Sequence, residues 1–359
     1  FFFKQKTAYE MIELGGDANN SGGAPLEKLE RNHVYQLLCR FMQKTVYLDI
    51  NLTVCPWIAL EPQVEEVKDI QITNCYVVPP GGRVHIPTDG VYKAWAQMDE
   101  FERTPIPDGE VTAEVLWVDG MGVVPASGVK VMNAEKRDKA YISVETENQS
   151  GNAVIAMKVN GKIYWSWHIW ATEYDPSQPA GQQTVGGNVF MDRNLGATSL
   201  VKGPQSAGCF YQWGRKDPFQ GPYTWMMFLN ANAGWSNDGI GKFMTLKGLA
   251  STKVPSENLV ASVQQPYRYI VGISGTQDWL SPDVGGEAYR WSNADGTKGV
   301  FDPCPEGWRV PVSGAGAASA WADLNGVWDA ERTGCVFAEG NGYYPAAGYI
   351  TVSYTHLTL

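Results

Sequence analysis

Across residues 66–176, short segments rich in β-branched and aromatic residues alternate with turn signals. Residues 153–159 and 162–172 flank Asn160-Gly161, the dipeptide most typical of a two-residue hairpin turn. We expect further strands at residues 74–78, 83–87, 111–118 and 140–144. Because roughly seven short strands in about 100 residues are typical of two packed antiparallel sheets, the pattern predicts an immunoglobulin-like β-sandwich here.

The last of these predicted strands is aromatic on both faces. Alternation places one set of side chains on one face, namely Trp165, Trp167 and Ile169, and a second set on the other, namely Tyr164, Ser166, His168 and Trp170. We expect the facing sheet to cover the first face and a neighbouring domain to cover the second. A sugar-stacking platform is the alternative. We interpret His168 as a hydrogen-bonded histidine at that interface.

The sequence on either side of this block has a different character. Residues 12–60 include an alternating segment at 47–54 that Pro56 ends, which indicates the last strand of a preceding domain. Residues 177–187 predict a linker. Residues 188–351 hold eight of the 14 tryptophans and long glycine-rich stretches, which predicts a mixed, loop-rich domain. Within it, only residues 244–249 and 315–328 have a helical pattern.

The composition argues against several classes of fold and function. The 28 Lys and Arg against 38 Asp and Glu give a net charge of -10, which argues against binding a nucleic-acid backbone. No run of about 18 apolar residues occurs, so we predict no transmembrane helix. The 39 Gly and 21 Pro favour short strands and tight turns, so an all-helical fold is excluded.

Both ends of the chain are predicted to be foreign to the natural protein. Residues 1–11 resemble translated sequencing-adapter sequence, and residues 352–359 resemble the same contaminant. An ordinary frayed terminus is the alternative. We leave both ends out of the fold prediction and expect a signal sequence to precede this fragment in the natural gene.

Four motifs follow one another in the second half of the chain, at residues 188–197, 208–219, 301–311 and 342–349. In this order they resemble the Fibrobacter succinogenes major paralogous domain, which is similar to C-type-lectin-like and formylglycine-generating-enzyme-like folds. Residues 151–156 and 165–170 look like the middle region of Bacteroidetes fimbrillin-family proteins that carry this domain. Residues 31–35 resemble the closing strand of an N-terminal fimbrillin domain.

The resemblance spans roughly residues 31–351 and implies a mainly β protein. A fimbrillin-like β-sandwich would be followed at 188–351 by a loop-rich α+β, C-type-lectin-like domain that ends short of the family's usual length, and 12–60 would be the remnant of an N-terminal fimbrillin-like β domain. The implied function is non-enzymatic: a cell-surface, outer-membrane fimbrial subunit, tip or minor, or an adhesin. Its implied partners are other fimbrial subunits and host or bacterial glycans or proteins.

The candidate ligand-binding residues lie in the loop-rich domain: Asp192, Arg193, Asn194, Trp213, Arg215, Asp217, Trp291 and Trp308. Carboxylate, guanidinium and amide groups can hold a sugar through paired hydrogen bonds, and tryptophans can stack on it. The alternative is structural: Arg193 would tie loops together, and Arg215, Lys216 and Asp217 would contribute a loop-tying ion pair. Asp302 before Pro303 is expected to cap a turn.

The sequence offers little for metal or covalent chemistry. Residues 291–296 are weakly similar to the calcium-ligating element of some C-type lectins, but no dense acidic cluster surrounds them, so we expect no cofactor and keep calcium as an option. We interpret Cys209 and Cys304 as core residues. A formylglycine-type enzyme would need Cys304 and Cys335 to be reactive, and a surface scaffold without a ligand is the other alternative.

Overall fold

The computed structural model describes most of the chain from residue 70 onward and two strands before it. The described residues are 34–40, 49–55, 70–119, 123–137, 139–185, 187–219, 221, 226–228, 249–272, 278–280, 290–293, 296–311, 326–330, 334–337 and 342–345. They form a mainly β protein with two α-helices, and the chain divides into two compact units, Phe1–Val67 and Lys68–Leu359. The predicted boundary at 177–187 stays a prediction.

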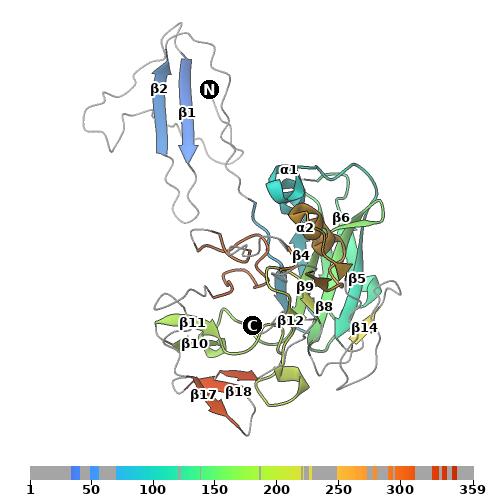
Figure 1. Cartoon of the computed structure of the whole chain (residues 1–359), viewed down its shortest axis with the longest axis vertical. Helices are drawn as coiled ribbons and strands as arrows, with labels where there is room; N and C mark the ends of the chain where they lie inside the picture. The colour runs from blue at the N-terminus through green and yellow to red at the C-terminus, as the bar shows by residue number, and fades with distance from the viewer. Residues whose placement is uncertain are drawn as a thin grey trace, which may run out of the picture. The chain divides into compact units, whose positions relative to one another are not determined.

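The first unit contains one antiparallel strand pair. β1 (Val34–Arg40) pairs with β2 (Asp49–Cys55), in a register that sets Leu37 opposite Leu52 (Figure 1). The strand expected at 47–54 corresponds to β2. Residues 1–11 and 352–359, which the sequence marks as foreign, lie outside the described residues.

The second unit is built on a five-stranded sheet in the order β14-β5-β8-β9-β3. Its strands are β3 (Cys75–Val78), β5 (Val111–Asp119), β8 (Gly151–Val159), β9 (Lys162–Ala171) and β14 (Met226–Phe228). β3 runs parallel to β9, and the other neighbours are antiparallel. The hairpin between β8 and β9 turns at Asn160 and Gly161, whose φ angles of 51° and 78° confirm the predicted tight turn.

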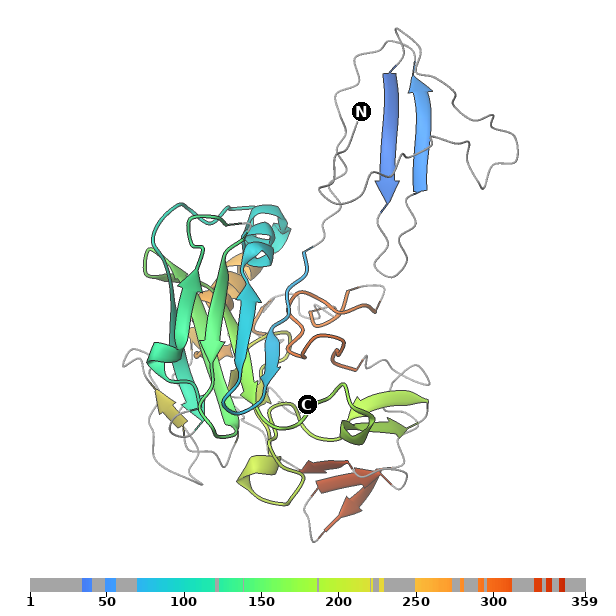
Figure 2. The same cartoon turned by 180° about the vertical axis from the view of Figure 1, so that it is seen from behind.

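A three-stranded antiparallel sheet, in the order β4-β7-β6, shares its core with the larger sheet (Figure 2). Its strands are β4 (Arg83–Pro87), β6 (Val129–Met132) and β7 (Tyr141–Glu145). Ile86 and Ile142 from the small sheet and Ile155 and Trp167 from the large one belong to one buried cluster. The strands expected at 74–78, 83–87, 111–118 and 140–144 are therefore confirmed.

Two short helices, neither of them predicted, complete this core. α1 (Asp89–Gln97) is followed by the 3-10 turn η1 (Asp99–Phe101). α2 (Pro255–Gln264) packs on η1 and β9. α1 buries Val91, Ala94 and Trp95, whereas α2 buries Leu259 and Val263. Both helices thus present one apolar stripe to the core.

The aromatic strand β9 is covered on both faces, as expected, but one of its residues is on the other side. Trp165, Trp167 and Ile169 lie in the shared core, and Tyr164 lies there too, in edge contact with Trp95 at a centroid distance of 5.0 Å. The prediction for Tyr164 was wrong because a β-bulge inserts it between the paired residues Ile163 and Trp165, and a bulge reverses the alternation locally.

The remaining strands are short and lie in loop-rich sequence. They are β10 (Gln182–Val185) with β11 (Asn188–Met191), β12 (Phe210–Tyr211) with β13 (Pro218–Phe219), β15 (Leu249–Ala250) with β16 (Ile270–Val271), and the three-stranded sheet β17 (Gly326–Asp329), β18 (Gly334–Phe337) and β19 (Tyr343–Pro345). Within the predicted linker, Gln182–Val185 form β10.

The helix expected at 315–328 is wrong at its C-terminal end, because Gly326–Asp329 forms β17 and pairs with β18. Strand pairing outweighs the helical spacing of the tryptophans there. Residues 315–325 lie outside the described residues, as do 244–248 of the other expected helix, whose last residue, Leu249, begins β15.

Candidate functional site

On the outer face of β9, the predicted site residue Asp217 meets Lys216 and Ser166. Lys216 Nζ lies 2.8 Å from Asp217 Oδ1 and donates to Ser166 Oγ at 2.7 Å, while Ser166 Oγ donates to Asp217 Oδ1 at 2.6 Å. The ammonium also lies 4.7 Å from the centre of the Trp165 ring. The predicted loop-tying ion pair is therefore present, between Lys216 and Asp217.

All three polar residues are buried. Burial lowers the pKa of Lys216 to about 8, and Asp217 opposes that shift. A serine hydrogen-bonded to a lysine can serve as a nucleophile, but only where a substrate can approach it. Ser166 is fully buried, so this arrangement fixes residues 216–217 on the sheet instead.

Arg215 fastens the end of α2. Its guanidinium donates to the backbone oxygens of several residues, namely Ser262 at 3.0 Å, Pro266 at 3.2 Å, Gln265 at 3.4 Å and Arg268. These carbonyls include ones that a helix leaves unsatisfied at its C-terminus. Burial lowers the pKa of Arg215 to about 10. The residue is 2% exposed and holds loops together.

The Asp192–Arg193–Asn194 motif also holds segments together. Arg193 Nε lies 2.6 Å from Asp192 Oδ1, and its guanidinium lies 3.9 Å from the centre of the Tyr174 ring. Asn194 Nδ2 donates to the backbone oxygens of Ala207, at 3.1 Å, and Pro345, at 3.2 Å. These contacts match the alternative in which Arg193 ties loops together.

The three predicted tryptophans are half-buried. The rings of Trp213 and Trp291 lie 6.4 Å apart, and Trp291 Nε1 donates to the backbone oxygen of Arg215 at 2.9 Å. Trp308 lies in a separate loop, where its backbone oxygen accepts a hydrogen bond from Lys298 at 2.6 Å. In the same loop Asp302 accepts from the backbone nitrogens of Cys304 and Val310, both at 2.8 Å, which confirms the expected turn cap.

His168 is the centre of a second buried network on β9. Its Nε2 lies 2.9 Å from Asn152 Oδ1, and its Nδ1 lies 3.2 Å from the Tyr211 hydroxyl and 3.3 Å from Cys75 Sγ. Burial lowers the pKa of His168 to about 3, so the ring is neutral at physiological pH. The prediction that His168 is hydrogen-bonded is confirmed, and its place at a domain interface stays a prediction.

The thiols and the possible calcium element show ordinary structural surroundings. Burial raises the pKa of Cys209 and Cys304 well above the usual value, which fits core residues. Asn293 donates to Thr297 Oγ1 at 2.9 Å, and residues 294–295 lie outside the described residues. Among the residues described, no three His, Cys, Asp or Glu side chains are placed to hold a metal ion.

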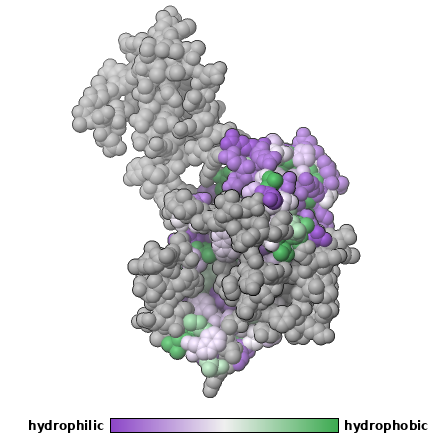
Figure 3. All heavy atoms as spheres, viewed as in Figure 1, coloured by the Kyte–Doolittle hydropathy of each residue, from purple (hydrophilic) through white to green (hydrophobic). Residues whose placement is uncertain are grey.

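Two other features of the described surface are open to solvent. The first is the edge strand β17, where Val327 is 58% and Trp328 57% exposed. In the space-filling view, hydrophobic residues show at the end of the unit that holds β17 and β18 (Figure 3). The sequence analysis placed Trp328 on a helix. The adjacent Val327 and Trp328, both of types common in strands, were the signal that could have indicated a strand here.

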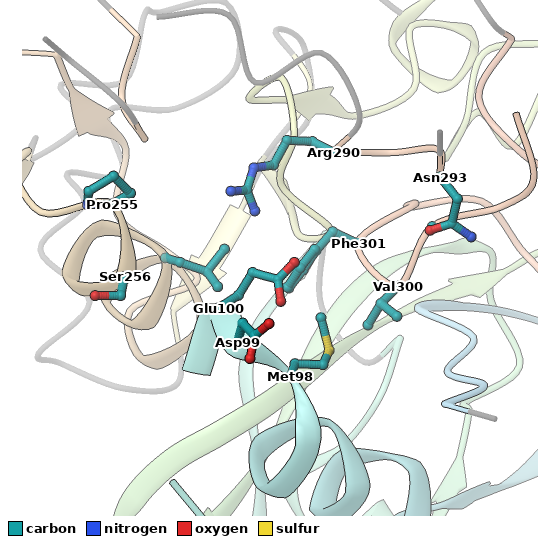
Figure 4. A pocket seen from close by; sticks show the side chains of 11 residues that line it. Met98, Asp99, Glu100, Pro255, Ser256, Arg290, Asn293, Val300 and Phe301 are labelled. Atoms are coloured by element: carbon teal, nitrogen blue, oxygen red, sulfur yellow. The ribbon is translucent and has the colours of Figure 1, made fainter. Parts of the chain in front are cut away.

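The second feature is a pocket of about 340 Å³ between η1, the start of α2 and residues 290–301 (Figure 4). It is lined by Met98, Asp99, Glu100, Pro255, Ser256, Leu259, Arg290, Asn293, Gly299, Val300 and Phe301. None of the eight predicted site residues lines it. Its polar residues escaped prediction because no motif joins them, and the fold brings them together from three distant segments.

Comparison of the chain with protein-family models, with curated proteins and with solved structures found no match. Within the part of the chain that the structure describes, no helix combines the length and the apolarity needed to cross a membrane.

Proposed function

We propose that this chain is a non-enzymatic cell-surface protein, a fimbrial subunit (tip or minor) or an adhesin, that binds glycan or protein through its aromatic-rich C-terminal part. The exposure of Trp328 on an edge strand is the observation that carries the proposal. An indole on the surface can stack on the apolar face of a sugar ring or anchor a protein partner. The proposal includes a finer fold: an immunoglobulin-like β-sandwich followed by a C-type-lectin-like domain.

The way in which the loops are held supports a recognition role. Arg215 and Asn194 donate to backbone oxygens far away in sequence, and Lys216 and Asp217 anchor their loop on β9. Loops fixed by such buried contacts lose little conformational freedom when a ligand binds, so less of the binding free energy is lost to ordering. A loop-rich unit can thereby present a defined surface.

The surroundings of the cysteines support the non-enzymatic proposal. The nucleophilic form of cysteine is the thiolate, and burial in apolar surroundings disfavours it. Burial raises the pKa of Cys304, and also that of Cys335 in β18. A formylglycine-type reaction would need the opposite shift.

A structural surface scaffold is the second candidate, because most described tryptophans, among them Trp117, Trp165, Trp167 and Trp170, are buried. The two candidates differ in what Trp328 does. In a scaffold it contributes only to stability, whereas in an adhesin it contacts the partner.

The test compares the whole chain with Trp328→Ala and Trp328→Phe on a glycan array and on immobilised host matrix proteins. We expect Trp328→Ala to weaken binding at least about tenfold and Trp328→Phe to weaken it less, because an aromatic ring remains. Val201→Ala is the control, since Val201 is 75% exposed. No binding by the unmodified chain, or full binding by Trp328→Ala with reduced stability, would favour the scaffold.

A further inference from the structure

The pocket beside η1 has an acidic wall and an apolar floor. Asp99 and Glu100 of η1 supply the acidic wall, and the Phe301 ring lies behind their carboxylates (Figure 4). Together with Phe301, the apolar side chains of the lining form the floor, namely Met98, Pro255, Leu259 and Val300. A pocket of this kind can recognise a molecule that has one charged group and an apolar body.

Glu100 is the acidic residue of the wall that the chain leaves to a ligand. Within the described ranges of the chain its carboxylate makes no hydrogen bond or ion pair, and the residue is exposed. The acidic residues on either side of it have partners. Asp99 Oδ1 accepts a hydrogen bond from Arg103 Nε at 2.7 Å. Glu102 Oε1 accepts one from Ser256 Oγ at 2.8 Å. The carboxylate of Glu100 is therefore available to a cationic group that can donate hydrogen bonds to it.

The positive groups beside the pocket are engaged within the protein. Arg290, the basic residue of the lining, has its Cζ 5.8 Å from the centre of the Phe301 ring and makes a further contact within the chain. The first turn of α2 carries the positive end of a helix dipole, but the carboxylate of Glu102 lies there, at Ser256. An anionic ligand would meet the carboxylates of η1, whereas these positive groups already have contacts. The lining therefore disfavours an anion.

The floor and walls of the pocket are held by the core. Leu259 and Phe301 are buried, and the Phe301 ring stacks with that of Trp165 at a centroid distance of 6.0 Å. The hydrogen bond between Ser256 and Glu102 joins α2 to the residue after η1. The pocket of about 340 Å³ is at the small end of the range for small-molecule sites, so it fits a compact ligand. Fixed walls also reduce the loss of conformational freedom on binding.

We propose that this pocket binds a primary amine with a compact apolar body. The ammonium group contacts Glu100 and lies beside Asp99, and the apolar body covers the floor. Like charges repel each other, so Arg290 keeps the ammonium group on the side of η1. A neutral sugar would cover Glu100 without supplying an ionic partner, which opposes its binding. The pocket is distinct from the surface around Trp328, so this ligand is additional to the proposed function and does not depend on it.

Calorimetric titration of the whole chain with phenethylamine and hexylamine tests the proposal. The comparison ligands are phenethyl alcohol, in which a hydroxyl group replaces the ammonium group, and hydrocinnamate, which carries a carboxylate on the same apolar body. We expect saturable binding of both amines and at least about tenfold weaker binding of the alcohol and of the carboxylate, because neither can form the ionic contact with Glu100. Equal or tighter binding of either comparison ligand, or no saturable binding of either amine up to about 10 mM, would overturn the proposal.

Two substitutions of Glu100 locate the binding site. Glu100→Gln should weaken phenethylamine binding at least about tenfold and leave the melting temperature unchanged, because Glu100 is exposed. Glu100→Asp keeps the charge and should lose less of the affinity. Glu147→Gln, which changes an exposed glutamate outside the pocket, is the matched control. Unchanged affinity in Glu100→Gln contradicts the proposal, whereas Trp328→Ala should bind phenethylamine normally whether or not the adhesin proposal holds.

Discussion

The outer face of β9 and the pocket beside η1 both gather charged side chains, yet they differ in how those charges are satisfied. On β9, Lys216 and Asp217 contact each other and Ser166, and all three are removed from solvent. In the pocket beside η1, Glu100 is exposed and has no side-chain hydrogen bond or ion pair within the residues that the structure describes. The charges on β9 are satisfied within the chain, whereas the charge of Glu100 faces solvent.

This difference separates structural from functional charges better than residue type does. Asp, Arg and Asn within one motif indicate recognition when only the sequence is considered. The structure shows that contacts within the chain already occupy the hydrogen-bonding groups of Asp192, Arg193 and Asn194. A charge that has found its partner inside the protein contributes to stability, and a charge at a cavity wall remains free to select a ligand.

The largest effect is expected from Lys216→Met. The substitution leaves Asp217 buried without its cation, and breaking a buried pair in this way costs about 3–5 kcal/mol. The free energy of unfolding, measured by urea denaturation, should fall by that amount. If it changes by less than about 1 kcal/mol, the Lys216–Asp217 pair does not fix its loop on β9.

Two further variants make this test more specific. Lys216→Met combined with Asp217→Leu removes both charges and should recover much of the lost stability, since replacing a buried pair by apolar groups is often neutral. Lys93→Met removes one partner of the exposed Lys93–Asp89 pair, whose separation is 3.1 Å. That control should change the free energy of unfolding by less than about 1 kcal/mol.

The second effect is a dependence of stability on pH that comes from His168. Because its pKa in the folded state is about 3 and its ordinary value 6.5, the unfolded chain binds more protons between these pH values. Stability is therefore lost as the pH falls through this window, by about 3 kcal/mol at pH 4 from this residue. Unfolding of wild type and His168→Gln between pH 7 and pH 4 measures it, and parallel profiles would contradict the prediction.

Much of the sheet architecture could be predicted from the sequence because its signals are local. Asn160-Gly161 determines a turn, and alternation determines the faces of β9 except at Tyr164, where a bulge changes the register. The helices could not be found in the same way. α1 and α2 have nine and ten residues, too few for a strong periodic pattern, and the shared core stabilises both.

The candidate site was harder to predict, for a physical reason. Motifs find residues that are close in sequence, and here those residues stabilise loops. Asp99 and Glu100 lie almost 200 positions before Arg290, and the fold places both segments around one pocket. The helical spacing of the tryptophans predicts a helix at Trp328, whereas pairing with β18 makes this segment a strand.

A smaller effect should follow from Arg193→Gln, at the less deeply buried of the two anchors. The substitution removes the ion pair with Asp192 and the contact with the Tyr174 ring. We expect the free energy of unfolding to fall by about 1–2 kcal/mol, less than for Lys216→Met, because water can replace part of the lost contact. Urea denaturation measures the change, and Lys202→Gln, an exposed site, is the control. A loss as large as that of Lys216→Met would show that the more deeply buried ion pair does not stabilise the fold more than the other.

The smallest effect on stability is expected from Glu100→Gln, and it is the one that most directly separates the two regions. Because Glu100 is exposed and lacks a partner within the described residues, its substitution should change the free energy of unfolding by less than about 0.5 kcal/mol. A buried charge on β9 should show the reverse, a large loss of stability. If Glu100→Gln instead destabilises the fold as Lys216→Met does, the pocket charge is structural and the contrast between the regions disappears.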